Sequence, residues 1–156
     1  MGDRTTVELM VQNQDADRTV AIIAAEGDAA SYDTQDDTFT TLTFDEVNYG
    51  TLRFLDKLEK AGIPYDSNWG DGDEYGSGST HLRFNAEGDP VKKEVYDEAV
   101  NPDLKVLMQL ADDDGPDALE NVRTYLRTHN AKVCYPEWDN QVEYAKLYRT
   151  KRLIQS

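Results

Sequence analysis

Apolar residues alternate with polar ones in the first structural element that the sequence predicts. In TVELMVQ, Val7, Leu9 and Val11 occupy every second position, which is the period of a strand with one buried face. TFTTLTFDEV is rich in β-branched and aromatic residues, and STHLRF alternates Leu82 and Phe84 with polar residues. These patterns, with the short segment before the glycine-rich loop, predict strands at residues 6–12, 38–47, 65–69 and 79–84.

A helix is predicted after the first strand. Asp15 or Asp17 can cap its start, and it runs through Glu26 to a stop at Gly27. A polar loop over residues 28–37 then leads to the second strand. The apolar stripe of this helix consists of Val20, Ile23 and Ala24.

The helix within YGTLRFLDKLEKAGIPY is the best specified element of the chain. Its leucines at positions 52, 55 and 58 share one broad face with Phe54 and Ala61. Gly62 falls just past the helix end, where Ile63 can fold back onto Leu58 in a Schellman contact, and Pro64 blocks continuation.

After Gly88 the pattern changes to one that favours helices. Prolines at positions 90, 102 and 116 each fit the first turn of a helix, which tolerates a missing backbone N–H. The sequence predicts helices at about 90–99, 102–111 and 116–129, a short strand at 131–135 and a final helix over 139–154. The core candidates of this part are Val91, Val95, Leu104, Leu107, Met108, Leu119, Val122 and Leu126.

The order strand-helix-strand-helix-strand-strand followed by helices predicts an α+β fold. In such a fold a small, mostly antiparallel sheet is covered by helices, here with a helical C-terminal part. One domain over residues 1–156 is the simpler arrangement for this length. A subdivision near residue 88, into an α/β part (1–88) and a mainly helical part (89–156), is the alternative.

Composition favours a folded protein of a reducing compartment. Apolar residues make up 38% of the chain and no apolar stretch approaches a membrane span or a secretory signal, so we expect a cytoplasmic protein. The single cysteine, Cys134, cannot form an internal disulfide and is expected to be a buried, inert thiol.

Charge is the strongest compositional signal. The chain has 31 acidic and 16 basic residues, for a net charge of −15, yet its last thirteen residues hold four bases and no acid. Such a body opposes direct binding to nucleic acid or to an anionic membrane, and it attracts basic proteins. The basic C-terminal helix could dock on the protein's own acidic surface or mediate a homo-oligomer contact.

The segment NWGDGDEYGSGSTH, residues 68–81, is the first place to look for chemistry. Read as an EF-hand loop from Asp71, it puts Tyr75 and Leu82 where calcium needs oxygen ligands. No lysine follows its small residues as in a phosphate-binding P-loop. The two histidines and the cysteine are not at metal-ligand spacing, so neither a metal nor another cofactor is predicted.

Nucleophilic catalysis is not supported by the sequence either. A triad of Ser77 or Ser79 with His81 would need an orienting acid that the sequence does not identify. Because His81 alternates with Leu82, we expect it on the opposite, wetter face of the sheet. No catalytic residue is predicted.

Two clusters that combine aromatic rings with carboxylates favour a binding function. Aromatic rings and carboxylates together can hold an arginine of a partner, by stacking and by ion pairing. The candidate partner-binding residues are Tyr65, Asp66, Trp69, Asp71, Asp73, Glu74 and Tyr75 around the loop, and Tyr32, Asp33, Asp36 and Asp37 in the earlier polar segment.

These observations lead to one hypothesis of function and two alternatives. The first is a non-enzymatic module that binds a basic protein, and in a sharper form an inhibitor that presents carboxylates as a nucleic-acid mimic to a nucleic-acid-binding protein. The second is a small enzyme or a ligand- or cation-binding domain with its site at the 68–81 loop and His81. The third is a structural or accessory protein whose acidic surface is adapted to salt.

Overall fold

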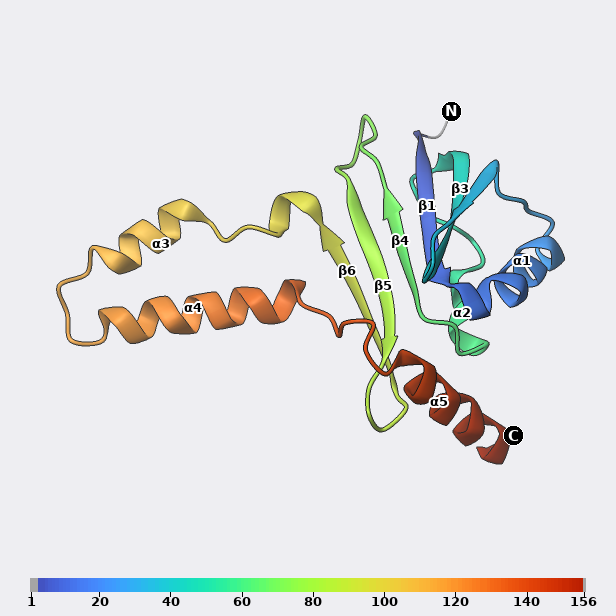
Figure 1. Cartoon of the computed structure of the whole chain (residues 1–156). Coiled ribbons are helices and arrows are strands. Elements are labelled where there is room, and N and C mark those ends of the chain that lie inside the picture. Colours follow the sequence, from blue (N-terminus) through green and yellow to red (C-terminus); the bar gives the residue numbers. More distant parts are fainter. Residues whose placement is uncertain (1–2, 156) are drawn as a thin grey trace.

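The computed structural model describes residues 3–155 and confirms the α+β class. Within this range the strands form one six-stranded antiparallel sheet in the order β2-β3-β1-β4-β5-β6 (Figure 1). The strands are β1 (Arg4–Gln12), β2 (Tyr32–Gln35), β3 (Phe39–Asn48), β4 (Tyr65–Trp69), β5 (Gly78–Phe84) and β6 (Pro90–Tyr96). The helices are α1 (Ala16–Ala25), α2 (Leu55–Lys60), α3 (Leu104–Ala111), α4 (Ala118–Val133) and α5 (Gln141–Gln155).

The core lies on one face of the sheet, called here the core face. Strand alternation places Val7, Leu9 and Val11 on this face, as the period-2 pattern predicts. Helices α1 and α2 cover it with Ile23 and Leu58. The other buried core residues are Leu42, Phe44, Leu52, Phe54, Ile63, Tyr65, Leu82, Phe84 and Ala145.

The C-terminal end of α2 follows the predicted Schellman geometry. Gly62 has a φ of 68°, and the Ile63 amide donates to the Leu58 carbonyl at 3.0 Å. Three arginines then satisfy carbonyls that the end of the helix leaves open. These are Arg18, which donates to Ala61 O at 2.7 Å, Arg149, to Gly62 O at 2.9 Å, and Arg152, to Lys60 O at 3.2 Å.

Helix α5 therefore uses part of its basic charge within the chain. Arg149 and Arg152 hold the end of α2, while Lys151 donates to the Glu87 carbonyl and lies 3.4 Å from an Asp89 carboxylate oxygen. The helix thus docks on the protein's own surface, but its basic side chains meet mainly backbone carbonyls there, with Asp89 as an acidic partner, and not the acidic face that was expected. The homo-oligomer contact through this helix stays a prediction.

The first helix has the expected bounds, since α1 starts after Asp15 and stops at Gly27, but its expected cap and the extent of the second helix differ. Asp15 stands at the start of α1, but its carboxylate pairs with Arg18 at 3.2 Å and makes no capping hydrogen bond. The helix of the YGTLRFLDKLEK segment is short, since only Leu55–Lys60 is helical and Leu52 and Phe54 reach the core from an irregular stretch. Within the polar segment 28–37, Tyr32–Gln35 forms the edge strand β2.

Two predictions for the second half of the chain are wrong. Residues 90–96 form strand β6 instead of a helix, so the sheet continues beyond residue 88. Val91 and Val95 are four residues apart and therefore share a face in a strand as well as in a helix. Their spacing alone does not distinguish the two elements. Residues 131–133 end helix α4 and Cys134 is extended, so the strand expected at 131–135 does not form.

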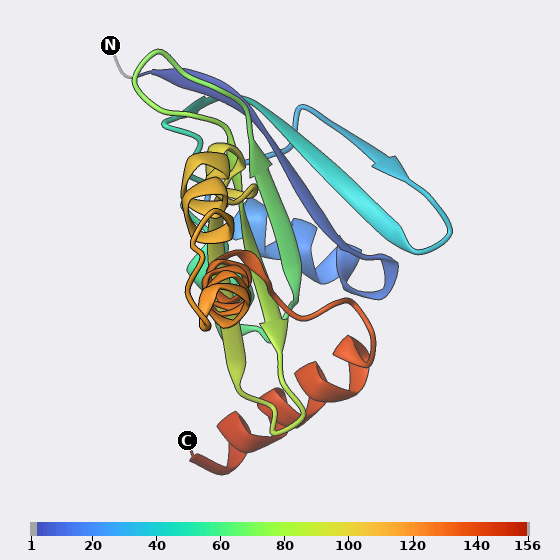
Figure 2. The same cartoon turned by 90° about the vertical axis from the view of Figure 1, so that its left-hand side faces the viewer.

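The core candidates on α3 and α4 are also wrong. Neither helix has a buried residue, because both project away from the sheet as a hairpin (Figures 1 and 2). Of the eight candidates beyond residue 88, Val95 is buried. Cys134, expected to be buried, is exposed.

Candidate functional site

The predicted loop joins β4 to β5 as a hairpin connection over residues 70–77, called here the acidic loop. Its backbone is tied down at several points. The Asp71 carboxylate accepts the Ser77 amide at 2.7 Å, Gly72 N donates to Tyr75 O at 3.0 Å, and an Asp3 carboxylate oxygen accepts the Glu74 amide at 2.9 Å. The side chains of Asp71, Asp73 and Glu74 remain exposed to solvent. The loop therefore presents three carboxylates from a fixed backbone.

Trp69, at the end of β4, is held in place beside this loop. Its indole N–H donates to the Gly76 carbonyl at 3.0 Å, and its ring meets Tyr96 edge-on at 5.9 Å between centroids. Gly50 and Gly78 make room for the indole, since a Cβ at either position would lie 2.8 or 2.6 Å from Trp69 side-chain atoms. The ring is thus pre-positioned, which lowers the entropic cost of binding a partner.

A cavity of about 560 Å³ opens on the core face next to the acidic loop. Two of its aromatic residues, Trp69 and Tyr75, were predicted as binding residues, while Tyr49 and Tyr96 were not. Tyr49 adopts a φ of 53°, a conformation that aromatic residues rarely take. The charged residues that line the cavity are Arg53, Asp56, Lys92 and Glu94.

This arrangement suits a cationic side chain better than an anion. Aromatic faces attract a guanidinium group, and the carboxylates of the acidic loop can pair with it. Of the cavity's own carboxylates, Asp56 lies 3.8 Å from Lys60 and is already paired. Lys92 lies 3.8 Å from a Glu59 carboxylate oxygen, so part of its charge is already compensated. Arg53 is exposed at the rim and works against a cationic ligand.

Tyr65 and Asp66 are not part of this surface. Tyr65 is fully buried in the core, and Asp66 is 8% exposed on the opposite face of the sheet. Both lie on β4, which leads into the acidic loop, and their burial prevents direct contact with a partner.

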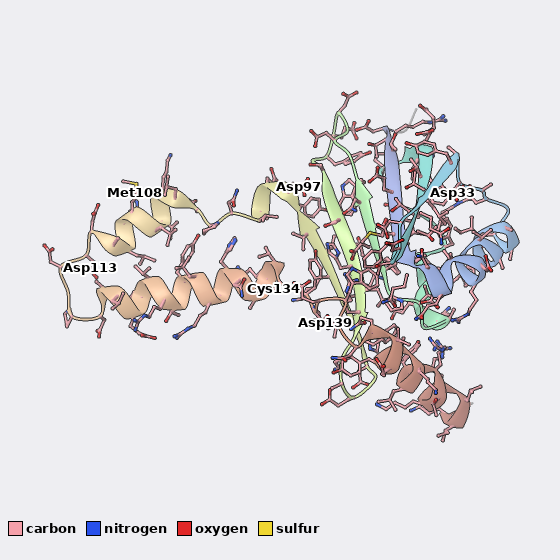
Figure 3. All side chains as sticks on the ribbon, viewed as in Figure 1. Asp33, Asp97, Met108, Asp113, Cys134 and Asp139 are labelled. Atoms are coloured by element: carbon pink, nitrogen blue, oxygen red, sulfur yellow. The ribbon has the colours of Figure 1, made fainter. Side chains whose placement is uncertain are left out.

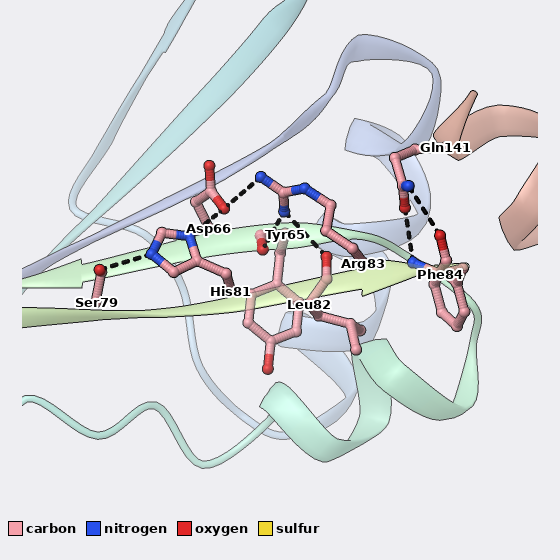
Figure 4. A network of polar contacts seen from close by, with 8 residues as sticks. All are labelled: Tyr65, Asp66, Ser79, His81, Leu82, Arg83, Phe84 and Gln141. Atoms are coloured by element: carbon pink, nitrogen blue, oxygen red, sulfur yellow. Dashed lines mark hydrogen bonds and ion pairs between the residues drawn. The ribbon is translucent and has the colours of Figure 1, made fainter. Parts of the chain in front are cut away.

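Asp66 is the centre of a buried polar network on β4 and β5 (Figure 4). One of its carboxylate oxygens lies 2.6 Å from His81 Nδ1 and 2.8 Å from Arg83 Nη2. The other ring nitrogen of His81, Nε2, lies 2.7 Å from Ser79 Oγ. Tyr135 stacks on the His81 ring at 3.6 Å between centroids, and Trp138 lies 3.7 Å above the Arg83 guanidinium.

His81 does face away from Leu82, but that face is not wet at this point. The segment after α4 crosses the sheet there, and its aromatic rings leave His81 only 4% exposed. The expected wetter environment is therefore wrong. His81 and the cavity of Trp69 also lie on opposite faces of the sheet, so they cannot form one site.

The network has the order of atoms found in a serine triad, Ser79–His81–Asp66. The structure thus supplies the orienting acid that the sequence could not identify. However, Arg83 shares the Asp66 oxygen, Tyr135 covers the imidazole, and none of the three described cavities is lined by Ser79. A triad needs access for a substrate and donors for an oxyanion. We assign the network to stability.

Burial and pairing act in opposite directions on Asp66. Burial by itself would raise the pKa of its carboxyl group, but the hydrogen bond to His81 and the charge of Arg83 outweigh it and hold the pKa below its ordinary value. The ionised network therefore stabilises the folded state.

Acid should weaken the protein through this group. Because the folded pKa of Asp66 is depressed, its contribution is present above the unfolded pKa and is lost as the pH falls through the folded one. Urea unfolding from about pH 7 to about pH 2.5 should show a steeper loss for the wild type than for Asp66→Asn, while the exposed-loop control Asp73→Asn follows the wild type. Parallel curves for Asp66→Asn and the wild type would contradict this assignment.

The second predicted cluster lies elsewhere on the molecule. Tyr32 and Asp33 are on edge strand β2, and Asp36 and Asp37 are in the turn to β3, all exposed. Hydrogen bonds from the Phe39 and Thr38 amides lower the pKa of Asp36, so this acid shapes the turn.

The strand registers separate this cluster from the acidic loop. Trp69 pairs with Val7, whereas the β2–β3 turn lies next to Gln12, about 17 Å along β1 at the rise of a strand. Strands β3 and β1 also stand between β2 and β4. The two clusters are thus separate surfaces.

No known protein family, curated protein or solved structure matches this chain. Across residues 3–155, no group of three or more histidine, cysteine, aspartate or glutamate side chains is arranged to hold a metal ion. Over the same residues, none of the helices combines the length and the apolar character needed to cross a membrane.

Proposed function

We propose that this chain is a non-enzymatic module that binds a basic partner protein through the acidic loop and the adjacent cavity. One observation carries the proposal: Trp69 and Tyr75 line a cavity of about 560 Å³, and the carboxylates of Asp71, Asp73 and Glu74 stay exposed beside it. An arginine side chain of the partner would enter the cavity, with further basic residues against the loop.

Charge and rigidity both support this function. A net charge of −15 steers a basic protein toward the surface and raises its association rate. The indole of Trp69 is fixed by its hydrogen bond to Gly76 O, and rigid aromatic anchors are typical of the residues that dominate binding energy. In the sharper version, the partner is a nucleic-acid-binding protein whose phosphate-binding surface the carboxylates occupy.

The enzyme alternative has weaker support because its two elements are separated. It requires the loop and His81 in one site, and His81 lies under Tyr135 on the other face of the sheet. The salt-adapted alternative differs from the proposal in a measurable way. It expects the loss of acidic residues to have the same effect wherever they lie on the surface.

Binding of an arginine-rich peptide tests the proposal. At about 50 mM NaCl the wild type should bind it, and binding should weaken at about 500 mM because salt screens exposed charges. The variant Asp73→Asn/Glu74→Gln should bind on the order of tenfold more weakly, as expected for two lost ion pairs of up to about 1 kcal/mol each.

A matched variant separates a specific site from general acidity. Asp112→Asn/Asp114→Asn removes the same charge at the far end of the α3–α4 hairpin and should change the affinity by less than about threefold. Equal losses in the two variants would refute a site at the loop and favour the salt-adapted alternative. Tyr75→Ala should also bind the peptide more weakly than the wild type, because the ring lines the cavity. Unchanged binding would show that the cavity is not part of the binding site.

A further inference from the structure

The helical hairpin of residues 100–133, called here the arm, is a second surface with unusual chemistry. It projects from the sheet edge beyond β6 (Figure 1), and α3 and α4 pack mainly on each other. The Asp103 amide donates to the Tyr125 hydroxyl at 3.0 Å, and His129 Nε2 lies 3.0 Å from the Val100 carbonyl oxygen. At its base, Lys93 donates to the Ala131 carbonyl at 3.0 Å. The arm thus has a defined shape.

Large apolar side chains on the arm remain in water. Leu104 and Met108, four residues apart, lie on one face of α3, and Leu119 and Leu126, seven apart, lie on one face of α4. Figure 3 shows Met108 projecting from α3 on the side away from α4. The exposed fractions are 69% for Leu104, 57% for Met108, 62% for Leu119 and 40% for Leu126. Apolar stripes on neighbouring helices are typical of a surface that a partner covers.

Charge along the arm indicates what that partner is. Its tip, residues 112–117, carries four aspartates and no base, and Asp113 lies at the turn between the helices (Figure 3). Residues 121–133 of α4 carry Arg123, Arg127 and Lys132 and no acid. Two arms placed antiparallel would set each acidic tip against the basic end of the other α4, around Arg127 and Lys132. A parallel pairing would instead bring the two acidic tips together.

The acidic residues near the base of the arm cause less electrostatic repulsion in this pairing than their number suggests, because they have partners within the chain. The Asp103 carboxylate caps α3 by accepting the Lys105 amide at 2.9 Å, and Asp97 accepts the Ser77 hydroxyl at 2.6 Å. Glu120 lies 3.4 Å from Arg127, and this exposed pair offsets part of the charge of Arg127 as well. These groups already have cationic or N–H/O–H partners within the chain.

From these observations we infer that the arm is a self-association surface, on which a second copy of this chain packs antiparallel with Leu119 and Leu126 at the centre of the contact. Helix α4 has 16 residues and is about 24 Å long, so the interface is small. The dimer should therefore form in the micromolar range and dissociate on dilution. This surface is independent of the acidic loop.

Sedimentation velocity of the full chain from about 2 to about 200 µM tests the inference, because a small interface should populate a dimer within this range. Leu119→Gln/Leu126→Gln should be monomeric throughout with an unchanged circular dichroism spectrum, since both side chains are exposed. Val20→Gln, which changes an equally exposed apolar residue of α1, should dimerise like the wild type. A wild type that stays monomeric at the highest concentration, or a leucine variant that still dimerises, would overturn the inference.

Charge reversal tests the antiparallel arrangement. Arg127→Glu/Lys132→Glu should not dimerise, because its acidic α4 would meet an acidic tip. Asp112→Lys/Asp113→Lys/Asp114→Lys should also fail, because its tip, then with three lysines and one aspartate, would meet a basic α4. Mixed in equal amounts, the two variants should form a heterodimer, since both contacts then join opposite charges. If each variant dimerises alone, or if the mixture does not associate, the antiparallel pairing is wrong.

Discussion

Replacing Arg83 with methionine should lower the free energy of unfolding by about 3–5 kcal/mol, the usual result of removing one partner of a buried ion pair. Arg83 is 1% exposed, and its guanidinium lies 2.8 Å from an Asp66 oxygen and donates to the Tyr65 and Leu82 carbonyls at 3.0 Å. Methionine keeps much of the apolar volume but leaves the Asp66 carboxylate buried with one fewer partner. Urea unfolding followed by circular dichroism measures the loss, which corresponds to a melting temperature lower by roughly 10 °C.

A surface arginine provides the matched control. Arg127 lies 3.4 Å from Glu120 with both side chains exposed, so Arg127→Met should change the free energy of unfolding by about 0.5 kcal/mol or less. In the double variant Asp66→Asn/Arg83→Met the loss should be smaller than the sum of the single losses, because the two groups interact directly. A loss below about 1 kcal/mol for Arg83→Met would show that the network does not stabilise the fold as its burial indicates.

The sheet was predictable from sequence where local patterns are unambiguous. The alternation of Val7, Leu9 and Val11 fixed the buried face of β1, and Gly62 with Ile63 marked the end of α2 because few residues allow that turn. The hairpin around the acidic loop was found for the same reason, since its glycines and acids separate two strand patterns. Val91 and Val95 failed because their spacing fits a strand and a helix equally.

The candidate site was predictable only in part, because its remaining residues come from tertiary contacts. Tyr96 reaches the cavity because it pairs with Gly78 across β5 and β6, and this register follows only once residues 90–96 are known to be a strand. The pairing of Asp66 with His81 likewise follows from the β4–β5 register. Tyr135 and Trp138 return to the sheet after the whole arm, and no local signal encodes that return.

The exposure of the arm shows a further limit of pattern reading. Leu104, Met108, Leu119 and Leu126 have the spacing of core residues, and the sequence correctly predicts that they lie on helices. An apolar stripe indicates that one face of a helix packs against other residues. It does not indicate whether those residues belong to the same chain or to a partner. The error in the predicted core is thus the observation on which the self-association surface rests.

Gln141→Leu should cost about 2–6 kcal/mol of unfolding free energy and should loosen α5 from the sheet. Gln141 is 1% exposed, and its side-chain amide holds both backbone groups of Phe84, accepting the N–H at 2.8 Å and donating to the carbonyl at 2.9 Å (Figure 4). Leucine would leave those two groups buried without partners, at about 1–3 kcal/mol each.

The same substitution at the far end of α5 separates this anchor from an effect on helix propensity. Gln155 is exposed, so Gln155→Leu should leave the free energy of unfolding within about 0.5 kcal/mol of the wild type. Hydrogen exchange should report faster opening of α5 in Gln141→Leu than in Gln155→Leu, because the Tyr148 ring that packs on Phe84 and the Arg149 contact with Gly62 O both depend on the docked helix. If the two variants unfold and exchange alike, Gln141 does not anchor α5, and the stability of that helix must come from its arginine contacts to α2.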